Sequence, residues 1–162
     1  MISNVEAALL AWTTSITGAV SPGGRHPAVF AWEGVKVSLH TNTGSDLLPE
    51  SHPMIIFACP SDGRIVGNLY SPVIRACTSV PILNGSYGDK SALDVHRGLM
   101  ALLRSWFLPA NIAAISSALT TEGNISCTDL YVQAGHEAKV TTKSGHPAWQ
   151  FEQPVKLCLF QN

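Results

Sequence analysis

Apolar residues at the start of the chain recur at helical spacing. They are separated by four, three and four positions and comprise Val5, Leu9, Trp12 and Ile16. Such spacing places them on one side of a helix. Residues 3–6 also have the Ser-x-x-Glu form of a capping box, which marks helix starts. We therefore predict an amphipathic helix over residues 3–17 that ends at Gly18, with a turn-rich connector over 21–27.

Short apolar runs separated by turn residues predict strands in the first half of the chain. The predicted strands are residues 29–32, 35–40, 54–59 and 73–83, the last interrupted near Pro81, and residues 65–70 are predicted to extend a short ribbon. The first two flank Glu33-Gly34, which is typical of a β-hairpin. The third is continuously apolar and ends at a Pro-Ser-Asp-Gly turn, which favours a central strand buried on both faces.

Two more helices are predicted in the second half. Asp89 or Ser91 can cap a helix over residues 89–107, whose apolar residues leave only a narrow polar face. Pro109 stops this helix and suits the first position of a third, over residues 109–121, so that the two helices meet at a corner. Alternating apolar residues then predict closing strands at residues 125–132, 138–142 and 148–160.

The order of these elements is helix, strands, two helices and strands. It predicts one α+β domain over residues 1–162, in which a mainly antiparallel sheet is packed by two or three helices. With 162 residues the chain is long enough to bury a core without disulfides or metals. Nothing in the sequence marks a domain boundary, an internal repeat or a low-complexity tract.

Charged residues are unusually few. Lys, Arg, Asp and Glu make up 13% of the chain, against about a quarter of an ordinary soluble domain. Either part of the surface faces other subunits or uncharged polar residues cover it, and composition leaves both readings open. The net charge of −1, without a basic run, argues against nucleic-acid binding. The apolar runs are too short for a membrane span and the N-terminus lacks a basic signal-peptide start, so we expect residence in a cytoplasm.

No local motif for catalysis or cofactor binding is present. The chain lacks the glycine-rich nucleotide loops, the zinc-protease motif, the nucleophile elbow and the calcium loop, so we expect neither enzyme activity nor a cofactor. The four cysteines, Cys59, Cys77, Cys127 and Cys158, lack the spacing of a zinc site and are typical of buried thiols. A thiol enzyme that pairs Cys59 with His96 is the alternative.

The histidines and one loop supply the remaining candidates. Five histidines fall in predicted loops or at strand ends, where surface positions are expected: His26, His40, His52, His136 and His146. His96 differs, since it stands inside the second helix, where its ring can bond a carbonyl or a carboxylate in a structural role. The loop over residues 41–53 carries Leu47 and Leu48 between Asp46 and Glu50. We expect either a subunit interface there or packing back onto the domain.

The second helix also resembles part of a known family. Residues 96–104, His-Arg-Gly-Leu-Met-Ala-Leu-Leu-Arg, lead through Pro109-Ala110-Asn111-Ile112 to Leu119. This segment resembles the central helix pair of phage tail terminator and tail-completion proteins, and the order of predicted elements is similar too. The candidate structural residues of this helix are His96, Arg97, Leu99 and Leu103. The low charge and the proline-interrupted stretch before Met54 depart from the family pattern.

The resemblance implies a structural protein of the virion. It implies a ring, usually of six subunits, that caps the tail tube, stops its polymerisation and joins it to the head connector or other neck proteins. DNA passes through such a ring without being specifically bound, and assembly takes place in the host cytoplasm. Subunits of a ring meet through different faces. The alternatives are another neck ring, such as a head-closure or adaptor protein, and a small thiol-dependent hydrolase.

Overall fold

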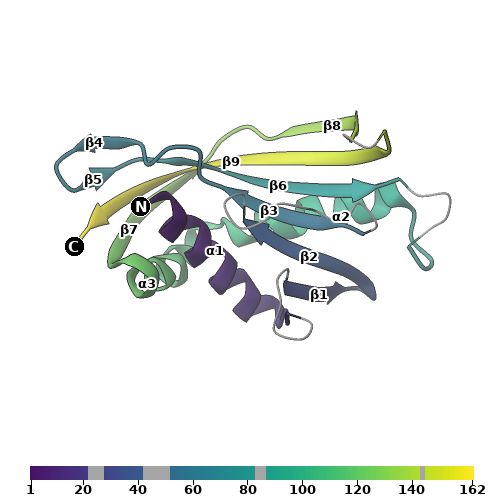
Figure 1. Ribbon diagram of the computed structural model, residues 1–162, viewed down its shortest axis with the longest axis horizontal. Helices are drawn as coiled ribbons and strands as arrows, with labels where there is room; N and C mark the ends of the chain where they lie inside the picture. Colours follow the sequence, from purple (N-terminus) through teal and green to yellow (C-terminus); the bar gives the residue numbers. More distant parts are fainter. Residues whose placement is uncertain (22–27, 42–51, 83–86, 143–144) are drawn as a thin grey trace.

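Three helices pack on one sheet in the computed structural model (Figure 1). The structure describes residues 1–21, 28–41, 52–82, 87–142 and 145–162. The helices are α1 (Ile2–Thr17), α2 (Ala92–Trp106) and α3 (Ile112–Gly123), with the 3-10 helix η2 (Pro109–Asn111) before α3. The strands are β1 (Ala28–Trp32), β2 (Val35–Thr41), β3 (Met54–Ala58), β4 (Arg64–Val66), β5 (Leu69–Tyr70), β6 (Val73–Pro81), β7 (Ile125–Val132), β8 (His136–Thr141) and β9 (Pro147–Gln161).

Strand β9 joins the two halves of the sheet. The strand order is β1-β2-β3-β6-β9-β5-β4, and β7 and β8 also pair with β9. Strands β6 and β8 pair with the same residues of β9, 148–152, so they flank it on opposite sides. Among the described strands every pairing is antiparallel except that of β2 with β3. The predicted α+β class, with a mainly antiparallel sheet and three helices, is therefore confirmed.

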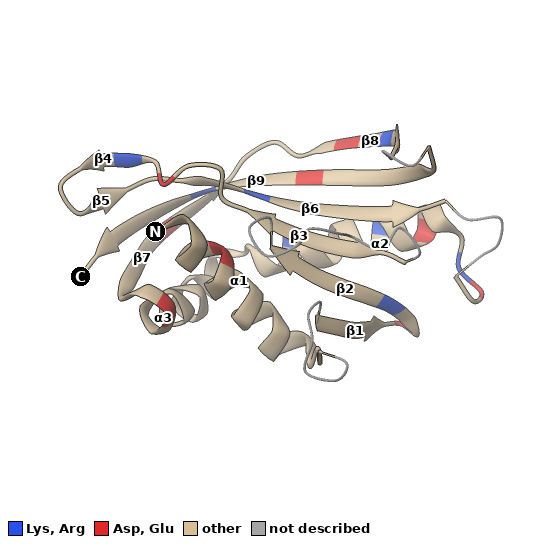
Figure 2. Ribbon diagram, viewed as in Figure 1, with Lys and Arg blue, Asp and Glu red and all other residues tan. Residues whose placement is uncertain are grey.

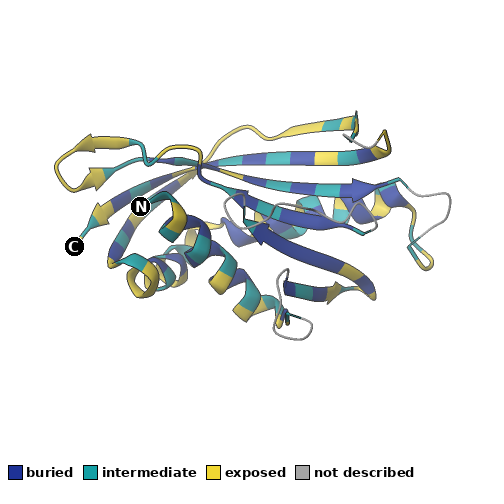
Figure 3. Cartoon of the chain, in the orientation of Figure 1, coloured by how far each residue is buried: buried dark blue, intermediate teal, exposed yellow. Residues whose placement is uncertain are grey.

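The sheet has a helix-covered face and an open face. Helix α1 contacts β2 and β3, α2 contacts β6 and β9, and α3 contacts β7. The side chains beneath the helices are fully buried and include Ile55, Phe57, Ile74, Phe151 and Val155. The side chains that alternate with them point to the open face. Ile56, Arg75 and Glu152 are partly or fully exposed there, whereas Met54 is buried (Figure 3). The hydrophobic core therefore lies between the helices and one side of the sheet.

The predicted capping box of α1 is wrong. Met1 occupies the cap position and makes no side-chain hydrogen bond there. The buried carboxylate of Glu6 instead accepts a hydrogen bond from the backbone N–H of Cys59, at 2.8 Å. Cys59 follows the last residue of β3, so Glu6 ties α1 to the end of that strand. The other end of α1 agrees with the prediction, because Gly18 closes it in the left-handed conformation, with φ 69°.

Helix α2 has a predicted cap but a broader exposed face than predicted. The Ser91 hydroxyl accepts from the Asp94 backbone N–H at 3.1 Å, and the Asp94 carboxylate accepts from the Ser91 N–H at 3.4 Å. The polar face is not narrow, since Arg97, Ala101 and Arg104 are all exposed. The helix therefore covers the sheet with one side and faces solvent with the other.

Helices α2 and α3 meet at the predicted corner. Pro109 begins η2, and the α-helix proper starts at Ile112, three residues later than predicted. The axes of the two segments are bent by 58°. No single helix in the described ranges is long and apolar enough to cross a membrane, and this bent pair meets that test only when both parts are taken together.

The predicted strands and hairpins are confirmed, with shifts of a few residues at their ends. Glu33 and Gly34 form the two-residue turn between β1 and β2, with φ of 46° and 82°. Positive φ at both positions is the conformation that matches the twist of a hairpin. Strand β3 lies inside the sheet between β2 and β6, as predicted, but it is not buried on both faces, since Ile56 and Ala58 on the open face are partly exposed. Strands β4 and β5 form the short ribbon predicted over residues 65–70.

Candidate assembly surface

The β4–β5 hairpin carries a cluster of exposed aliphatic side chains. We call residues 63–71 the arm. Within it Ile65 is 67% exposed, Val66 64% and Leu69 45%. Figure 3 shows the exposed residues of β4 and β5 at the end of the molecule that also holds the C-terminus. Large apolar side chains that gather on a surface in this way mark contact sites for partners.

The arm is firmly attached to the sheet. Its base is closed by a hydrogen bond from the Ser71 N–H to the Gly63 carbonyl, at 2.8 Å. Gly63 has φ 61°, and a Cβ at this position would lie 2.5 Å from the Ser71 carbonyl oxygen, so glycine is required there. Strand β5 pairs with β9, and the Gln161 N–H donates to the Asn68 carbonyl at 2.9 Å. The arm therefore presents its apolar side chains from a defined position.

A hollow of about 220 Å³ lies where the arm meets the end of β9. Its apolar lining includes Ile65, Leu69, Cys158 and Phe160. Leu69 lies opposite Phe160 in the β5–β9 register, so both side chains point to the open face. The arm and the end of β9 together make one end of the open face apolar.

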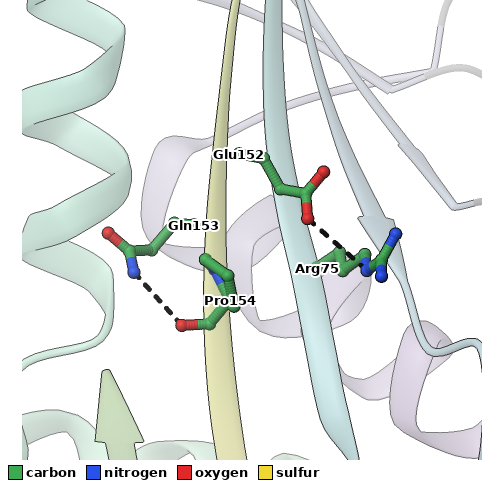
Figure 4. A network of polar contacts seen from close by, with 4 residues as sticks. All are labelled: Arg75, Glu152, Gln153 and Pro154. Carbon is green, nitrogen blue, oxygen red and sulfur yellow. Dashed lines mark hydrogen bonds and ion pairs between the residues drawn. The ribbon is translucent and has the colours of Figure 1, made fainter. Parts of the chain in front are cut away.

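The middle of the open face is charged. Arg75 on β6 and Glu152 on β9 form an ion pair, with the guanidinium Nε 3.4 Å from the carboxylate oxygen (Figure 4). Gln153 leaves β9 in the opposite direction, is buried, and donates from Nε2 to the Pro154 carbonyl at 3.1 Å. Charged residues are otherwise sparse over the ribbon, as Figure 2 shows. An exposed pair of this kind contributes little to stability, typically below about 1 kcal/mol.

The opposite end of the open face contains a second hollow. It has a volume of about 400 Å³, and its lining combines the apolar residues Met54, Ile56, Pro81, Val140 and Ala148 with polar residues that include Ser79, Thr141 and Gln150. These residues come from β3, β6, β8 and β9, so the hollow spans four strands. The open face therefore carries apolar side chains at both ends, with the Arg75–Glu152 ion pair and the exposed Lys156 between them.

The four residues predicted as a structural motif of α2 divide between its two sides. His96, Leu99 and Leu103 are fully buried against the sheet, whereas Arg97 is exposed. The His96 ring stacks on Trp149 with the ring centres 5.5 Å apart. Its Nε2 is 2.6 Å from a carboxylate oxygen of Glu137, and because that oxygen is an acceptor, the ring nitrogen donates. His96 thus links α2 to β8 and β9 through one of the two kinds of partner expected.

The predicted interface loop lies outside the residues that the structure describes. This applies to all four of its candidate residues: Asp46, Leu47, Leu48 and Glu50. Their role as a subunit interface stays a prediction. The arm was predicted from the sequence only as a short ribbon. Its exposed apolar surface is a feature that the structure adds. Its signal in the sequence is Ile65-Val66, two adjacent apolar residues in a strand that is too short to bury both.

Of the four cysteines predicted to be buried thiols, Cys59 and Cys127 are buried, whereas Cys77 and Cys158 are partly exposed. Burial, and after it the nearby Glu6 carboxylate, raises the pKa of Cys59 to about 11. The Cys59 thiol donates to the Ser61 carbonyl at 3.4 Å, while His96 bonds Glu137. The pKa values of Cys77 and Cys127 are also raised to about 11, chiefly by burial. A thiolate is the reactive form, so these environments disfavour the thiol-enzyme alternative.

His40 was predicted to lie on the surface, and this prediction is wrong. His40 is buried in β2, and its Nε2 is 2.8 Å from the hydroxyl oxygen of Ser38. Burial, and after it the neighbouring His52, lowers the pKa of His40 to about 4. The alternating pattern of β2 placed this side chain on the polar side of the strand, and only the fold shows that the site is covered. No cluster of three metal-ligating side chains is found in the described ranges.

Comparison with known proteins adds no relative. No protein-family model matches the chain, and no curated protein matches it either.

Proposed function

We propose that this chain is a structural subunit that assembles with copies of itself. The observation that carries the proposal is the arm, which holds Ile65, Val66 and Leu69 in solvent on a well-anchored hairpin. Only 13% of the residues are charged, so the chain has few charges whose repulsion would prevent such surfaces from associating. Burying these three side chains against a neighbour removes apolar area from water, which favours association.

Within this class we propose a ring at the top of a phage tail tube. In this role the ring ends tail polymerisation and joins the tail to the head connector, with DNA passing through its centre. The support is the likeness of the His96–Leu119 segment to tail terminators, together with a mixed α+β fold whose elements follow the expected order. The ring, the six-fold stoichiometry and the virion location all belong to this proposal.

Measurement of size tests the proposal at its base. Light scattering on the purified chain is expected to give a mass several times the 17.3 kDa of one copy. Negative-stain images are expected to show rings, and added protein is expected to bind the upper end of purified phage tails. A chain that stays monomeric at high concentration and binds no tails contradicts the proposal. Binding to heads instead of tails indicates another neck ring.

The predicted interface loop supplies a separate test. Leu47→Asp is expected to weaken assembly and to leave the fold intact, because a charge opposes burial at a subunit contact. Circular dichroism and sizing of the same sample separate these effects. Loss of helix signal in this variant would mean that Leu47 packs inside its own subunit.

A further inference from the structure

The helical layer contains a groove on the side away from the sheet. It lies between α1 and α3 and has a volume of about 490 Å³. Its lining consists of Ala11, Trp12, Ala114 and Ala118 together with the polar residues Ser15, Ser117, Thr121 and Glu122. Trp12 is buried and forms apolar surface at its base, while Ala11, Ala114 and Glu122 are exposed. The residues of α1 and α3 that face the core, such as Leu9 and Leu119, lie on the other side of these helices. We call this hollow the α1–α3 groove.

The groove carries one charge that has no partner among the residues that the structure describes. Glu122 is the only charged residue of α3, and the one charged residue of α1, Glu6, faces the sheet (Figure 2). Within the part of the chain that the structure describes, the Glu122 carboxylate makes no hydrogen bond or ion pair. The groove therefore combines alanine and tryptophan surface, interspersed with the hydroxyl groups of Ser15, Ser117 and Thr121, with a single negative charge.

The arm has the complementary arrangement. Arg64 is exposed and directly precedes Ile65 and Val66 in β4, and it is the only charged residue of that strand. Among the described residues its guanidinium has no carboxylate partner, since Asp62 accepts only from the Arg64 backbone N–H, at 3.1 Å. A cation next to two aliphatic side chains on the arm thus matches an anion next to apolar surface in the groove.

We propose that the arm of one copy occupies the α1–α3 groove of a second copy. Ile65 and Val66 then cover Trp12, and Arg64 pairs with Glu122. This inference rests on the proposed self-assembly and names the two surfaces that meet. The arm cannot fill the groove of its own chain, because it is fixed to β9 in the sheet while the groove opens on the outer side of the helical layer (Figure 1).

The two surfaces belong to different parts of the subunit, so the contact is heterologous. Each added copy brings one arm and one groove, and association continues until the first and last copies meet. A closed ring is the expected product. A symmetric pair of arms, by contrast, would bring two Arg64 side chains together and would stop at a dimer, which the charges oppose.

Two variants with complementary defects test the heterologous contact. Ile65→Asp damages the arm and leaves the groove intact, and Glu122→Arg damages the groove and leaves the arm intact. Each alone is expected to weaken self-association by roughly tenfold or more. Mixed in equal amounts, they are expected to form a heterodimer, because the intact arm of one meets the intact groove of the other. Analytical ultracentrifugation detects this species, with circular dichroism to show that each variant is folded.

A charge exchange tests the pairing itself. Arg64→Glu alone is expected to weaken assembly, and Arg64→Glu combined with Glu122→Arg is expected to restore most of it. Arg97→Glu reverses an exposed cation on α2, away from both surfaces, and serves as the matched control with unchanged assembly. Failure of the double variant to recover, with both single variants folded, overturns the pairing.

The outcomes separate this inference from the proposed function. If the unaltered chain assembles and Ile65→Asp assembles equally well, the arm contact is wrong and self-assembly through another surface stands. If assembly depends on the arm but the rings bind no tails, the arm contact stands and the tail role is wrong. If the unaltered chain stays monomeric at all concentrations, both are wrong. If Ile65→Asp self-associates normally but no longer binds tails, the partner of the arm is a tail protein and the inference is overturned.

Discussion

Two phenylalanines on strand β9 show how differently the two faces of the sheet are used. Phe151 is 1% exposed on the helix-covered face, with the Arg104 guanidinium 4.8 Å from its ring centre. Phe160 is 41% exposed on the open face beside the arm. The strand and the residue type are the same, yet one ring holds the fold together and the other is available to a neighbour. Apolar sequence alone therefore does not distinguish core from contact surface.

The largest expected effect is the difference between a charge introduced beneath the helices and the same charge introduced on the arm. Leu99→Asp places a carboxylate where the side chain is fully buried, and we expect a loss of more than about 4 kcal/mol, enough to unfold the chain. Ile65→Asp on the arm is expected to leave the circular dichroism spectrum unchanged. Thermal unfolding of both variants checks this, and a folded Leu99 variant would show that the helix-covered face tolerates charge.

Truncation of the two phenylalanines sharpens the comparison within one strand. Phe151→Ala is expected to lower the free energy of unfolding by about 3–5 kcal/mol, because it leaves a cavity in the core. Phe160→Ala is expected to cost less than about 1 kcal/mol, since its ring already contacts water. Urea unfolding measures both. Equal losses would mean that the end of β9 is part of the core.

His40 is expected to make stability depend on pH, because its side chain is buried although it lies on the open side of β2. Its pKa is lowered from 6.5 to about 4, so below pH 6.5 the unfolded chain binds a proton that the folded chain does not. This stabilisation is full above pH 6.5 and is lost progressively as the pH falls to about 4, by at most roughly 3 kcal/mol. Unfolding titrations of the chain and of His40→Gln between pH 4 and pH 7 are expected to differ in slope. Parallel curves would show that His40 is accessible to water.

A smaller effect is expected at the first turns of α1. Glu6→Ala leaves the Cys59 N–H buried without its acceptor and is expected to cost about 1–3 kcal/mol. Ser3→Ala is expected to change the free energy of unfolding by less than about 0.5 kcal/mol, because Ser3 does not cap the helix. Chemical denaturation of the two variants decides between the roles. A larger loss at Ser3 than at Glu6 would restore the capping box.

Local patterns predicted the elements well and the contacts between them poorly. The hairpin turn at Glu33-Gly34, the cap at Ser91 and the end of α1 at Gly18 depend on neighbouring residues, and each is found where the sequence placed it. The Ser-x-x-Glu motif of α1 predicted a capping box, but a glutamate near a helix start can equally accept a hydrogen bond from a distant backbone N–H, as Glu6 does from Cys59. Which use applies depends on whether a distant N–H is within reach.

The same contrast between predicted elements and unpredicted contacts holds for the candidate assembly surface. The short, apolar sequence of β4 was visible, but its exposure depends on where β9 ends and on the absence of any described helix over that face. Likewise the sequence marked His96 as an internal helix residue, while the choice of Glu137 as its partner came from the pairing of β8 with β9.

The sequence by itself determined the kinds and order of the elements and the low charge, because turns, caps and periodicity act over a few residues. Only the tertiary structure decided which apolar residues are covered. The Glu6–Cys59 and His96–Glu137 contacts join residues 53 and 41 positions apart. Burial of this kind depends on which faces the folded chain brings together, and so the arm and the α1–α3 groove became visible only in three dimensions.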